Sequence, residues 1–574
     1  MAWLFGGTIF APAARVEPKV WVPMRDGVRL MADVHRPDQP GSYPVLLMRT
    51  PYGRKGAAVA APYVAAGYIV VSQDARGRYE SEGEFLSFAH PQTHDAEDGY
   101  DTVEWAARLA GSSGKVGTLG ASYDAFLQWK LAALRPPSLA AMAASSIPAR
   151  LVDLEQPGTI RPGRRLHWFH NTIAPDIRKH SGLPGPQTGS EASAVWTRGG
   201  KEMLWFLPWM ELPDAFWGSK REAEGYRAWM RAPAHDPWRL AEAAPQVTVP
   251  NLCFVGWYDH CNGAIDIHRA MVANGGSERA RRHQRLVIGP WSHGGMGNRK
   301  VGAFDYGADA TVSMVQEHIR WFNHWLKGEE NGVAADSVAR VFVLGANRWR
   351  DESEWPLSRA TRREFSLASS GRAATPAGDG RLVSGAAPKA GQNRYTYDPR
   401  DPVPTLWTAS LFTIPADQGP LKERADILVY QTEPLRERME VIGYPEVELH
   451  AASSAPDTDF FVRLIDVAPD GQAIDVASGM VRARFRDSLE KPRLLAPGQP
   501  TRFRIRMRPT AIEFQAGHRI RLDVTSSDFP NYDRNHNTAA DQNADATLTP
   551  AQNTVFHGGT LGSKLILPVI PAGR

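Results

Sequence analysis

The stretch that decides the fold runs from residue 116 to residue 125 and reads VGTLGASYDA. An apolar run passes into Gly120-Ala121-Ser122, and a helix-compatible stretch follows at 126–134. A nucleophile elbow needs this order, because small neighbours let a serine on a strained strand-to-helix turn expose its hydroxyl above a sheet. The full Gly-x-Ser-x-Gly pattern is not met, since position 124 is Asp. A serine that merely caps an ordinary helix is the alternative interpretation.

Strand-like and helix-like segments alternate on both sides of this stretch. Continuous apolar runs predict strands that are buried on both faces, at 45–48, 68–71, 116–119, 252–257, 285–289 and 341–344, the last of these closing the series. Helical spacing predicts helices at 57–66, 95–109 and 312–327. An Asp-Gly turn at residues 26–27 also predicts a hairpin between 20–24 and 28–34. Strands that alternate with helices indicate a parallel sheet with helices on both faces.

Two further regions differ from this α/β part in amino-acid composition and in their pattern of apolar residues. Residues 148–245 are rich in Trp, Pro, His and Arg and predict a mainly helical insertion. Residues 366–393 are rich in Gly, Ala, Ser and Pro and predict a long surface loop. Short alternating strands after this loop predict an antiparallel sandwich, at 425–431, 440–450, 458–467, 501–507 and 519–525.

Composition excludes several classes of protein. The chain has 574 residues with 66 Lys and Arg against 62 Asp and Glu, and this net charge of +4 indicates no nucleic-acid partner. Two cysteines exclude a disulfide framework and a Cys-rich metal site, which fits a cytoplasmic protein. No apolar run is long enough to span a membrane. The apolar segment 1–14 has no basic residue before it and predicts a loose or docked arm, not a secretory signal.

A nucleophilic serine needs a base and a carboxylate that orients the base. In a hydrolase sheet of this kind the chain order is serine, acid, histidine. Asp259 follows the apolar run 252–255, and His293 follows the run 286–289, so both lie at the carboxyl ends of strands, where sites form. A turn carboxylate and a structural histidine are the alternatives for each residue alone. Their joint occurrence in the right order favours a catalytic pair.

An oxyanion formed at the serine needs hydrogen-bond donors. The backbone N–H of Tyr123, which follows the nucleophile, is the expected first donor. Tyr52 lies in a loop directly after the strand-like run 45–48, and a phenol can serve as the second donor. From the pattern alone, an aromatic side chain packed within its loop is the better interpretation of Tyr52.

Longer motifs spread from residue 20 to residue 540 resemble those of a known family. They include Arg49-Thr50-Pro51-Tyr52, Gly120-Ala121-Ser122-Tyr123, Gly256-Trp257-Tyr258-Asp259, Gly289-Pro290-Trp291-Ser292-His293 and Phe529-Pro530-Asn531-Tyr532-Asp533-Arg534-Asn535. Together they resemble the CocE/NonD family of serine hydrolases, which includes bacterial cocaine esterase, and the related X-Pro dipeptidyl peptidases of family S15.

The resemblance implies an α/β-hydrolase domain that is split by a helical cap and followed by a C-terminal β jelly roll. The expected division places the hydrolase domain at 1–147 and 246–352, the cap at 148–245 and the jelly roll at 353–574. Ser122 would be the nucleophile, His293 the general base and Asp259 the residue that orients it. Tyr52 and the Tyr123 N–H would form the oxyanion hole. Neither a metal nor an organic cofactor is expected.

The resemblance also places an acyl pocket between cap, hydrolase domain and jelly roll. Cocaine esterase carries an aromatic residue just after the catalytic Asp, where this chain has His260-Cys261. An aromatic wall is therefore expected from elsewhere, with Trp168, Trp407 and Phe412 as candidates, although buried packing explains each of them equally well. The family usually has Gly where this chain has Ala125, so the nearby helix must tolerate a methyl group there.

The expected function is that of a cytoplasmic serine esterase that cleaves small carboxylic esters or amides through an acyl-enzyme. The first alternative is an X-Pro dipeptidyl peptidase or an α-amino acid ester or β-lactam acylase. The residues just after the catalytic Asp, His260-Cys261-Asn262, supply no acidic side chain to hold a substrate ammonium, so this alternative needs a carboxylate from the cap. The second alternative is a non-catalytic binding module. The expected partner is a small ester or amide, without nucleic acid or membrane, and a homodimer or larger assembly is compatible with the family.

Overall fold

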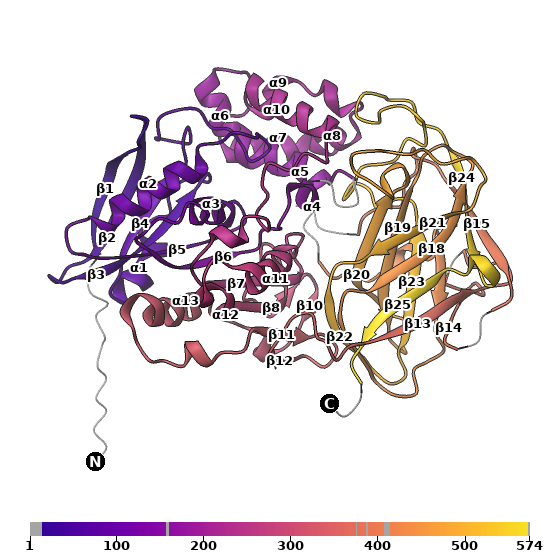
Figure 1. Ribbon diagram of the computed structural model, residues 1–574. Coiled ribbons are helices and arrows are strands. Elements are labelled where there is room, and N and C mark those ends of the chain that lie inside the picture. Colours follow the sequence, from indigo (N-terminus) through magenta and orange to yellow (C-terminus); the bar gives the residue numbers. More distant parts are fainter. Residues whose placement is uncertain (1–13, 156–159, 375, 386–387, 407–413, 572–574) are drawn as a thin grey trace, which may run out of the picture.

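The computed structural model describes residues 14–155, 160–374, 376–385, 388–406 and 414–571. Figure 1 shows three parts: a body built on a parallel sheet, a helical segment above it, and a β domain beside both. Apart from Ala14, the N-terminal arm expected from the sequence lies outside the described residues, as do Trp407 and Phe412. No arrangement is therefore assigned to these two pocket candidates.

The first body is a ten-stranded sheet in the order β1-β2-β4-β3-β5-β6-β7-β8-β11-β12. Neighbouring strands from β4 to β11 are parallel, whereas β1, β2 and β12 pair in antiparallel fashion. The bounds are β1 Ala14–Pro23, β2 Arg29–Pro37, β3 Tyr43–Thr50, β4 Ile69–Asp74, β5 Ser112–Ala121, β6 Leu139–Ser145, β7 Asn251–Tyr258, β8 Gln284–Ser292, β11 Ala339–Val343 and β12 Arg348–Glu352. A two-stranded ribbon, β9 Lys300–Val301 and β10 Phe304–Asp305, follows β8.

Helices cover both faces of this sheet. They are α1 Ala57–Ala65, α2 Asp95–Ala107, α3 Tyr123–Ala132, α11 Ala264–Asn274, α12 Glu278–Arg282 and α13 Met314–Phe322. Successive side chains of β3 point to opposite faces of the sheet. Leu47 packs in one core with Phe126 of α3, and Leu46 packs in another core with Phe322 of α13. The continuous apolar runs of the sequence are thus strands buried on both sides, as predicted.

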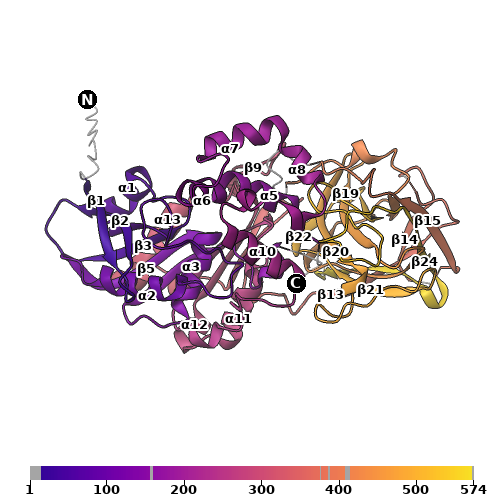
Figure 2. The ribbon, with the colours of Figure 1, turned by 90° about the horizontal axis from the view of Figure 1, so that it is seen from above.

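A helical segment lies between β6 and β7. Its helices are α4 Leu151–Glu155, α5 Gly163–Trp168, α6 Ala174–Ser181, α7 Gly189–Val195, α8 Lys201–Trp205, α9 Asp214–Trp217 and α10 Lys220–Arg231. The views in Figures 1 and 2 agree that it lies over the parallel-sheet body and reaches the β domain. The Gly163 N–H donates to Asn531 O at 2.8 Å, and the Asp533 N–H donates to Arg161 O at 2.7 Å. These bonds fix the segment to the β domain.

In the described part of the β domain, thirteen strands are joined by mostly antiparallel pairing. They are β13 Thr361–Ala368, β14 Arg381–Val383, β15 Gly391–Tyr397, β16 Leu428–Gln431, β17 Met439–Gly443, β18 Glu446–Ser453, β19 Asp459–Val467, β20 Ala473–Arg482, β21 Thr501–Arg506, β22 Thr510–Phe514, β23 Arg519–Thr525, β24 Ala551–His557 and β25 Lys564–Val569. Among the strands that the structure describes in this domain, only β14 and β16 pair in parallel.

Three expectations about strands were wrong. Residues 366–393 are not one loop, because β14 lies within them and pairs with β13. Residues 440–450 form two strands, β17 and β18, which are separated at Tyr444-Pro445 because proline has no N–H to donate to a ladder. The strand at 341–344 is not the last of the first sheet, because β12 pairs with it on its outer side.

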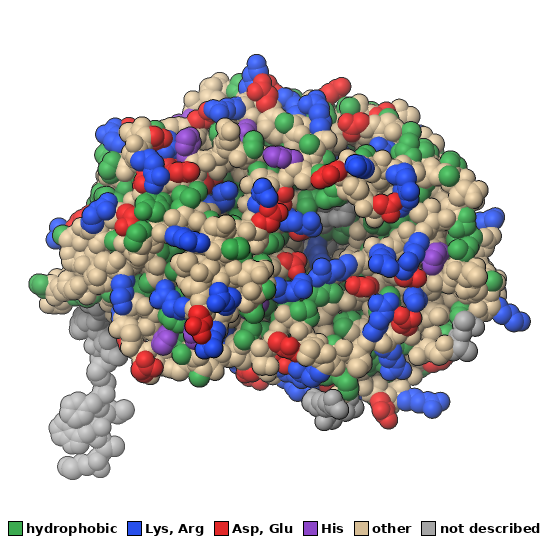
Figure 3. Space-filling model, viewed as in Figure 1, with side chains coloured by type: hydrophobic (Ala, Val, Ile, Leu, Met, Phe, Trp, Pro, Cys, Tyr) green, Lys and Arg blue, Asp and Glu red, His purple; other side chains and the backbone are tan. Residues whose placement is uncertain are grey.

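The helix lengths, the surface charges and the cysteines add three observations. Within the described residues, no helix has the length and apolar character that crossing a lipid bilayer requires. Basic and acidic side chains are interspersed on the face that Figure 3 shows. Cys253 and Cys261 are both buried, and neither forms a disulfide.

Candidate active site

Ser122 occupies a sharp turn between β5 and α3. Its φ of +61° and ψ of −126° lie in a region that side chains other than glycine rarely adopt. The Ser122 N–H donates to Ser145 O at 3.0 Å, and the Ser122 carbonyl accepts from the Phe126 N–H at 3.1 Å. Its side chain makes no capping hydrogen bond to α3. The geometry is therefore that of an elbow, and a helix-capping serine does not describe it.

The residues around Ser122 explain why the elbow has small neighbours. A side chain at Gly120, which has φ +148°, would place its Cβ 2.5 Å from the Cβ of Asp124. Asp124 is itself buried, and this burial raises the pKa of its carboxyl to about 6. Ala125 is fully buried, so its methyl group is accommodated within the packed interior of the body.

Asp259 and His293 meet at the ends of neighbouring strands. Asp259 follows β7 and is fully buried, and its Oδ1 accepts from His293 Nδ1 at 2.9 Å and from the Cys261 N–H at 2.7 Å. Burial raises the pKa of Asp259, but the charge of His293 and the hydrogen bonds that Asp259 accepts together outweigh burial and leave this pKa below its usual value. Burial lowers the pKa of His293, but the effects of Asp259 and Cys261 together outweigh burial and hold this pKa well above its usual value. With Nδ1 held by Asp259, Nε2 is the ring nitrogen placed to act as a base.

A cavity of about 430 Å³ brings the predicted residues together. Ser122, His293 and Tyr52 all line it. Burial raises the pKa of Tyr52, and a hydrogen bond with Ser122 acts on this pKa in the opposite direction. Tyr52 is therefore a neutral phenol that can donate beside the serine. Tyr123 begins α3, and its ring packs inward with its centroid 4.7 Å from that of Phe88, which leaves its backbone as the oxyanion candidate.

The pocket residues expected from the sequence fall into three groups. Trp168 and His260 line the cavity, Cys261 is buried beside His293, and Trp407 and Phe412 lie outside the described residues. Trp168 stacks on Phe88 with ring centroids 5.7 Å apart, so an aromatic wall is present. Sequence reasoning missed the other lining residues: Phe88, Ile147, Leu154, Pro162, Arg164, Arg165, His167 and Thr172.

One group of described residues has the donors to hold a metal ion. Asp259, His260, Cys261 and His293 each offer one ligand atom, and these four atoms lie within 4.8 Å of one another. Carboxylate, imidazole and thiolate are ligands that Zn²⁺ accepts. The 2.9 Å hydrogen bond between Asp259 and His293 already accounts for the closeness of two of the four. A site free of metal stays the prediction from the sequence.

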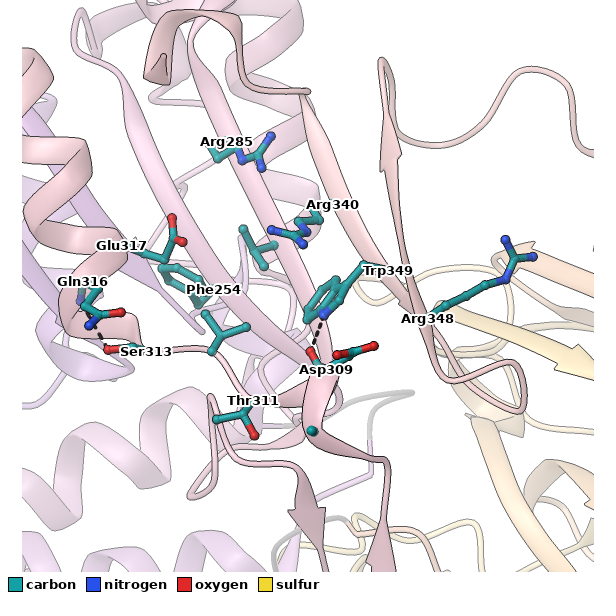
Figure 4. Close-up of a pocket in the computed structure, with 13 residues that line it drawn as sticks. Phe254, Arg285, Asp309, Thr311, Ser313, Gln316, Glu317, Arg340, Arg348 and Trp349 are labelled. Atoms are coloured by element: carbon teal, nitrogen blue, oxygen red, sulfur yellow. Dashed lines mark hydrogen bonds between the residues drawn. The ribbon is translucent and has the colours of Figure 1, made fainter. Parts of the chain in front are cut away.

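A larger cavity, of about 670 Å³, lies elsewhere on the parallel-sheet body. Figure 4 shows its charged and polar wall, with Arg285, Arg340 and Trp349 on one side and Glu317 on α13 on the other. Its hydroxyls include Ser313, which caps α13 by accepting from the Gln316 N–H at 3.4 Å. None of the described residues that line it is a histidine, so Ser313 lacks the histidine base that a serine nucleophile of the Ser-His-Asp kind uses.

Two family models match the chain. The model of the X-Pro dipeptidyl-peptidase (S15 family) matches residues 26–295, which include Ser122, Asp259 and His293. The model of the X-Pro dipeptidyl-peptidase C-terminal non-catalytic domain matches residues 331–566. The second match includes β11 and β12, the last two strands of the first sheet, together with most of the β domain.

Similar proteins extend over nearly the whole chain. Cocaine esterase from Rhodococcus sp. (strain MB1 Bresler) is 34% identical, and the alignment covers 97% of this chain and 98% of the relative. The structure of an α-amino acid ester hydrolase is 25% identical with a TM-score of 0.78, covering 99% of this chain and 98% of that one. An aminopeptidase from the marine sediment archaeon Thaumarchaeota archaeon shares the fold, at 23% identity and a TM-score of 0.79, with 98% and 97% covered. The chain belongs to the CocE/NonD family of serine hydrolases, with the α/β-hydrolase and C-terminal β domains of the S15 peptidases.

Proposed function

We propose that this protein is a serine carboxylesterase that hydrolyses small carboxylic esters, and amides of the same size, through an acyl-enzyme. One observation above all supports the proposal. A serine in a strained elbow shares a cavity with a histidine that is hydrogen-bonded to a buried carboxylate. Serine, histidine and carboxylate in this relation are the parts that acyl transfer needs.

In the proposed first step, Ser122 Oγ attacks the ester carbonyl carbon while His293 Nε2 takes the hydroxyl proton. Negative charge develops on the carbonyl oxygen, and the Tyr52 O–H and the Tyr123 N–H donate to it. Asp259 stabilises the imidazolium, as the raised pKa of His293 indicates. When the tetrahedral intermediate collapses, the bond to the alcohol breaks and His293 gives its proton to the leaving oxygen.

In the second step, a water molecule attacks the acyl-enzyme and His293 takes a proton from it. Collapse of the second intermediate releases the carboxylic acid, and the proton returns to Ser122 Oγ. The cavity volume of about 430 Å³ fits a substrate of modest size.

The second candidate function is cleavage of substrates with a free amine, as the names of the aminopeptidase and the α-amino acid ester hydrolase suggest for those proteins. An ammonium group in a buried site needs an anionic partner. None of the described residues that line the cavity is Asp or Glu. This observation favours the esterase.

Hydrolysis of 4-nitrophenyl esters from acetate to octanoate, and of the benzoate, tests the proposal. We expect wild type to cleave short members of the series and Ser122→Ala to lose at least about 10³-fold in kcat/KM. Gly-Pro 4-nitroanilide and phenylglycine methyl ester test the second candidate, and we expect both to be poor substrates. Equal activity of wild type and Ser122→Ala would contradict the esterase proposal.

We also propose the fold of the β domain, the domain bounds, the cellular location and the partners of this protein. We propose that the β domain is a jelly roll, supported by the antiparallel pairing of β19 with β20 and β23. We also propose the division 1–147, 148–245, 246–352 and 353–574, which agrees with the ends of β6 at Ser145 and β12 at Glu352. A cytoplasmic location is supported by the two free cysteines. The proposed partner is a small ester or amide, without nucleic acid or membrane, and a homodimer or larger assembly is compatible with the family.

A further inference from the structure

The wall of the catalytic cavity contains a buried arginine that lacks a counter-charge among the described residues. Arg164 lies on α5, is 5% exposed and lines the same cavity as Ser122 and His293. Its Nη2 donates to Leu154 O at 3.2 Å, whereas its Nη1 is buried without a hydrogen-bond partner among the described residues. An ion in that position is costly unless something pairs with it.

The other groups around the cavity leave this positive charge uncompensated. The described lining residues include Arg164, Arg165 and three histidines, but no Asp or Glu. The Arg165 guanidinium packs 4.0 Å from the ring centroid of Trp168 and contributes a second positive charge. Burial and then the charge of Arg164 hold the pKa of His260 well below its usual value, so His260 is neutral. The cavity is therefore electropositive near the nucleophile.

Arg164 is also held in place by the packing of its helix. The residue before it, Gly163, contacts the β domain so closely that a Cβ there would lie 2.0 Å from Pro530 O. On the other side, the Arg164 guanidinium lies 5.9 Å from the ring centroid of Tyr532. A donor that is fixed before the ligand arrives loses little conformational entropy on binding.

We propose that Arg164 binds a carboxylate group of the substrate, so that the preferred substrates are esters that carry a second, free acid. The inference rests on the esterase function proposed above and narrows its substrate class. A carboxylate accepts two parallel hydrogen bonds from a guanidinium, and Nη1 of Arg164 offers the donor that is still unpaired. The free acid can belong to the acyl part, as in a dicarboxylic half-ester, or to the alcohol part, as in an ester of a hydroxy acid.

Two matched substrate pairs test the inference and separate these sources. For the acyl side we compare the mono-4-nitrophenyl ester of adipic acid with 4-nitrophenyl hexanoate. For the alcohol side we compare 4-acetoxybenzoate with 4-acetoxybenzamide. The ratio of kcat/KM for the acidic member to that for the neutral member is measured in wild type and in Arg164→Gln. Comparing the two proteins cancels the intrinsic reactivities of the substrates.

We expect the ratio to fall about 10- to 100-fold in Arg164→Gln for one of the two pairs, mainly through KM, because a charge-assisted hydrogen bond is lost. Arg164→Lys keeps the positive charge but loses the two parallel N–H donors of the guanidinium. We expect its ratio to lie between those of wild type and Arg164→Gln. Arg150→Gln removes the same charge from an exposed residue that pairs with Asp153, and we expect wild-type ratios. Thermal unfolding and labelling by a fluorophosphonate report whether each variant is folded.

Two outcomes would overturn the inference in distinguishable ways. If Arg164→Gln keeps the wild-type ratio for both pairs while Ser122 remains reactive, the esterase stands and the role of Arg164 is wrong. If wild type cleaves neither pair and Ser122 is not labelled by the fluorophosphonate, the proposed function fails and the inference fails with it.

Discussion

At the scale of single residues, the oxyanion role proposed for Tyr52 is one that only its O–H can perform. Tyr52→Phe keeps the ring, which makes edge contacts with Tyr123 and Trp168 at centroid distances of 6.5 and 6.4 Å. We expect kcat to fall about 10²- to 10³-fold with little change in KM, because a donor to the oxyanion is lost while the pocket is preserved. Steady-state kinetics on a 4-nitrophenyl ester measure this. Tyr63→Phe, which removes a buried phenol that contacts His318, is the control. Equal losses in both variants would argue against the assignment.

The Asp259–His293 pair predicts the pH dependence of activity. His293 must be neutral to act as the base, and Asp259 holds the pKa of His293 above the usual 6.5. We therefore expect kcat/KM to rise with pH along a limb whose midpoint lies above 6.5. In Asp259→Asn the negative charge is gone, so the midpoint moves to lower pH while activity falls by several orders of magnitude. A midpoint that does not move in this variant would contradict the coupling.

At the scale of secondary-structure elements, the position of α5 depends on Gly163. An alanine Cβ at this position would lie 2.0 Å from Pro530 O, so the helix or the β domain must shift. We expect Gly163→Ala to lower the free energy of unfolding by about 1–3 kcal/mol and to reduce kcat/KM, because α5 also carries Arg164 and Trp168. Gly199→Ala is the matched control in the same segment, since its nearest atom would be 4.0 Å away. Chemical denaturation of both variants decides the point.

The elements that the sequence predicted well are those with a strong local signal. The runs at 45–48 and 252–257 became β3 and β7, and the serine, acid and histidine each follow a strand as expected. The strand β6 went unpredicted because Leu139–Ser145 is mostly alanine, which has low strand propensity, and its place is set by pairing with β5 and β7. Arg164 gave no signal, because an arginine in a helical segment usually faces water.

At the scale of the whole molecule, a buried ion pair joins the helical segment to the β domain. Arg161 and Asp533 are buried and hydrogen-bonded to each other. Burial lowers the pKa of Arg161, which shows that its charge is costly to bury. The intact pair therefore adds little net stability, whereas removing one partner leaves a buried charge and destabilises the fold. We expect Asp533→Asn to reduce the free energy of unfolding by about 3–5 kcal/mol, because Arg161 then keeps its charge without a partner. Urea denaturation at neutral pH measures this loss.

The same pair predicts a pH window for stability. Burial raises the pKa of Asp533, but the charge and hydrogen bond of Arg161 and the charges of His536 and Arg482 together outweigh burial. They bring this pKa to about 2, below the unfolded value of 3.8. Its contribution is therefore present above pH 3.8 and is lost as the pH falls through about 2. We expect the difference in stability between wild type and Asp533→Asn to shrink across that window. A difference that stays constant would mean that the pair does not titrate as described.

If Ser122 is the nucleophile, its side chain carries the acyl group of the substrate during turnover. Mass spectrometry detects this acyl-enzyme. The protein is mixed with 4-nitrophenyl butyrate, quenched in acid during turnover and digested. We expect a mass increase of one butyryl group on the peptide that contains Ser122, and no such adduct in Ser122→Ala. An unmodified Ser122 peptide during undiminished turnover, or an adduct on another residue, would contradict it.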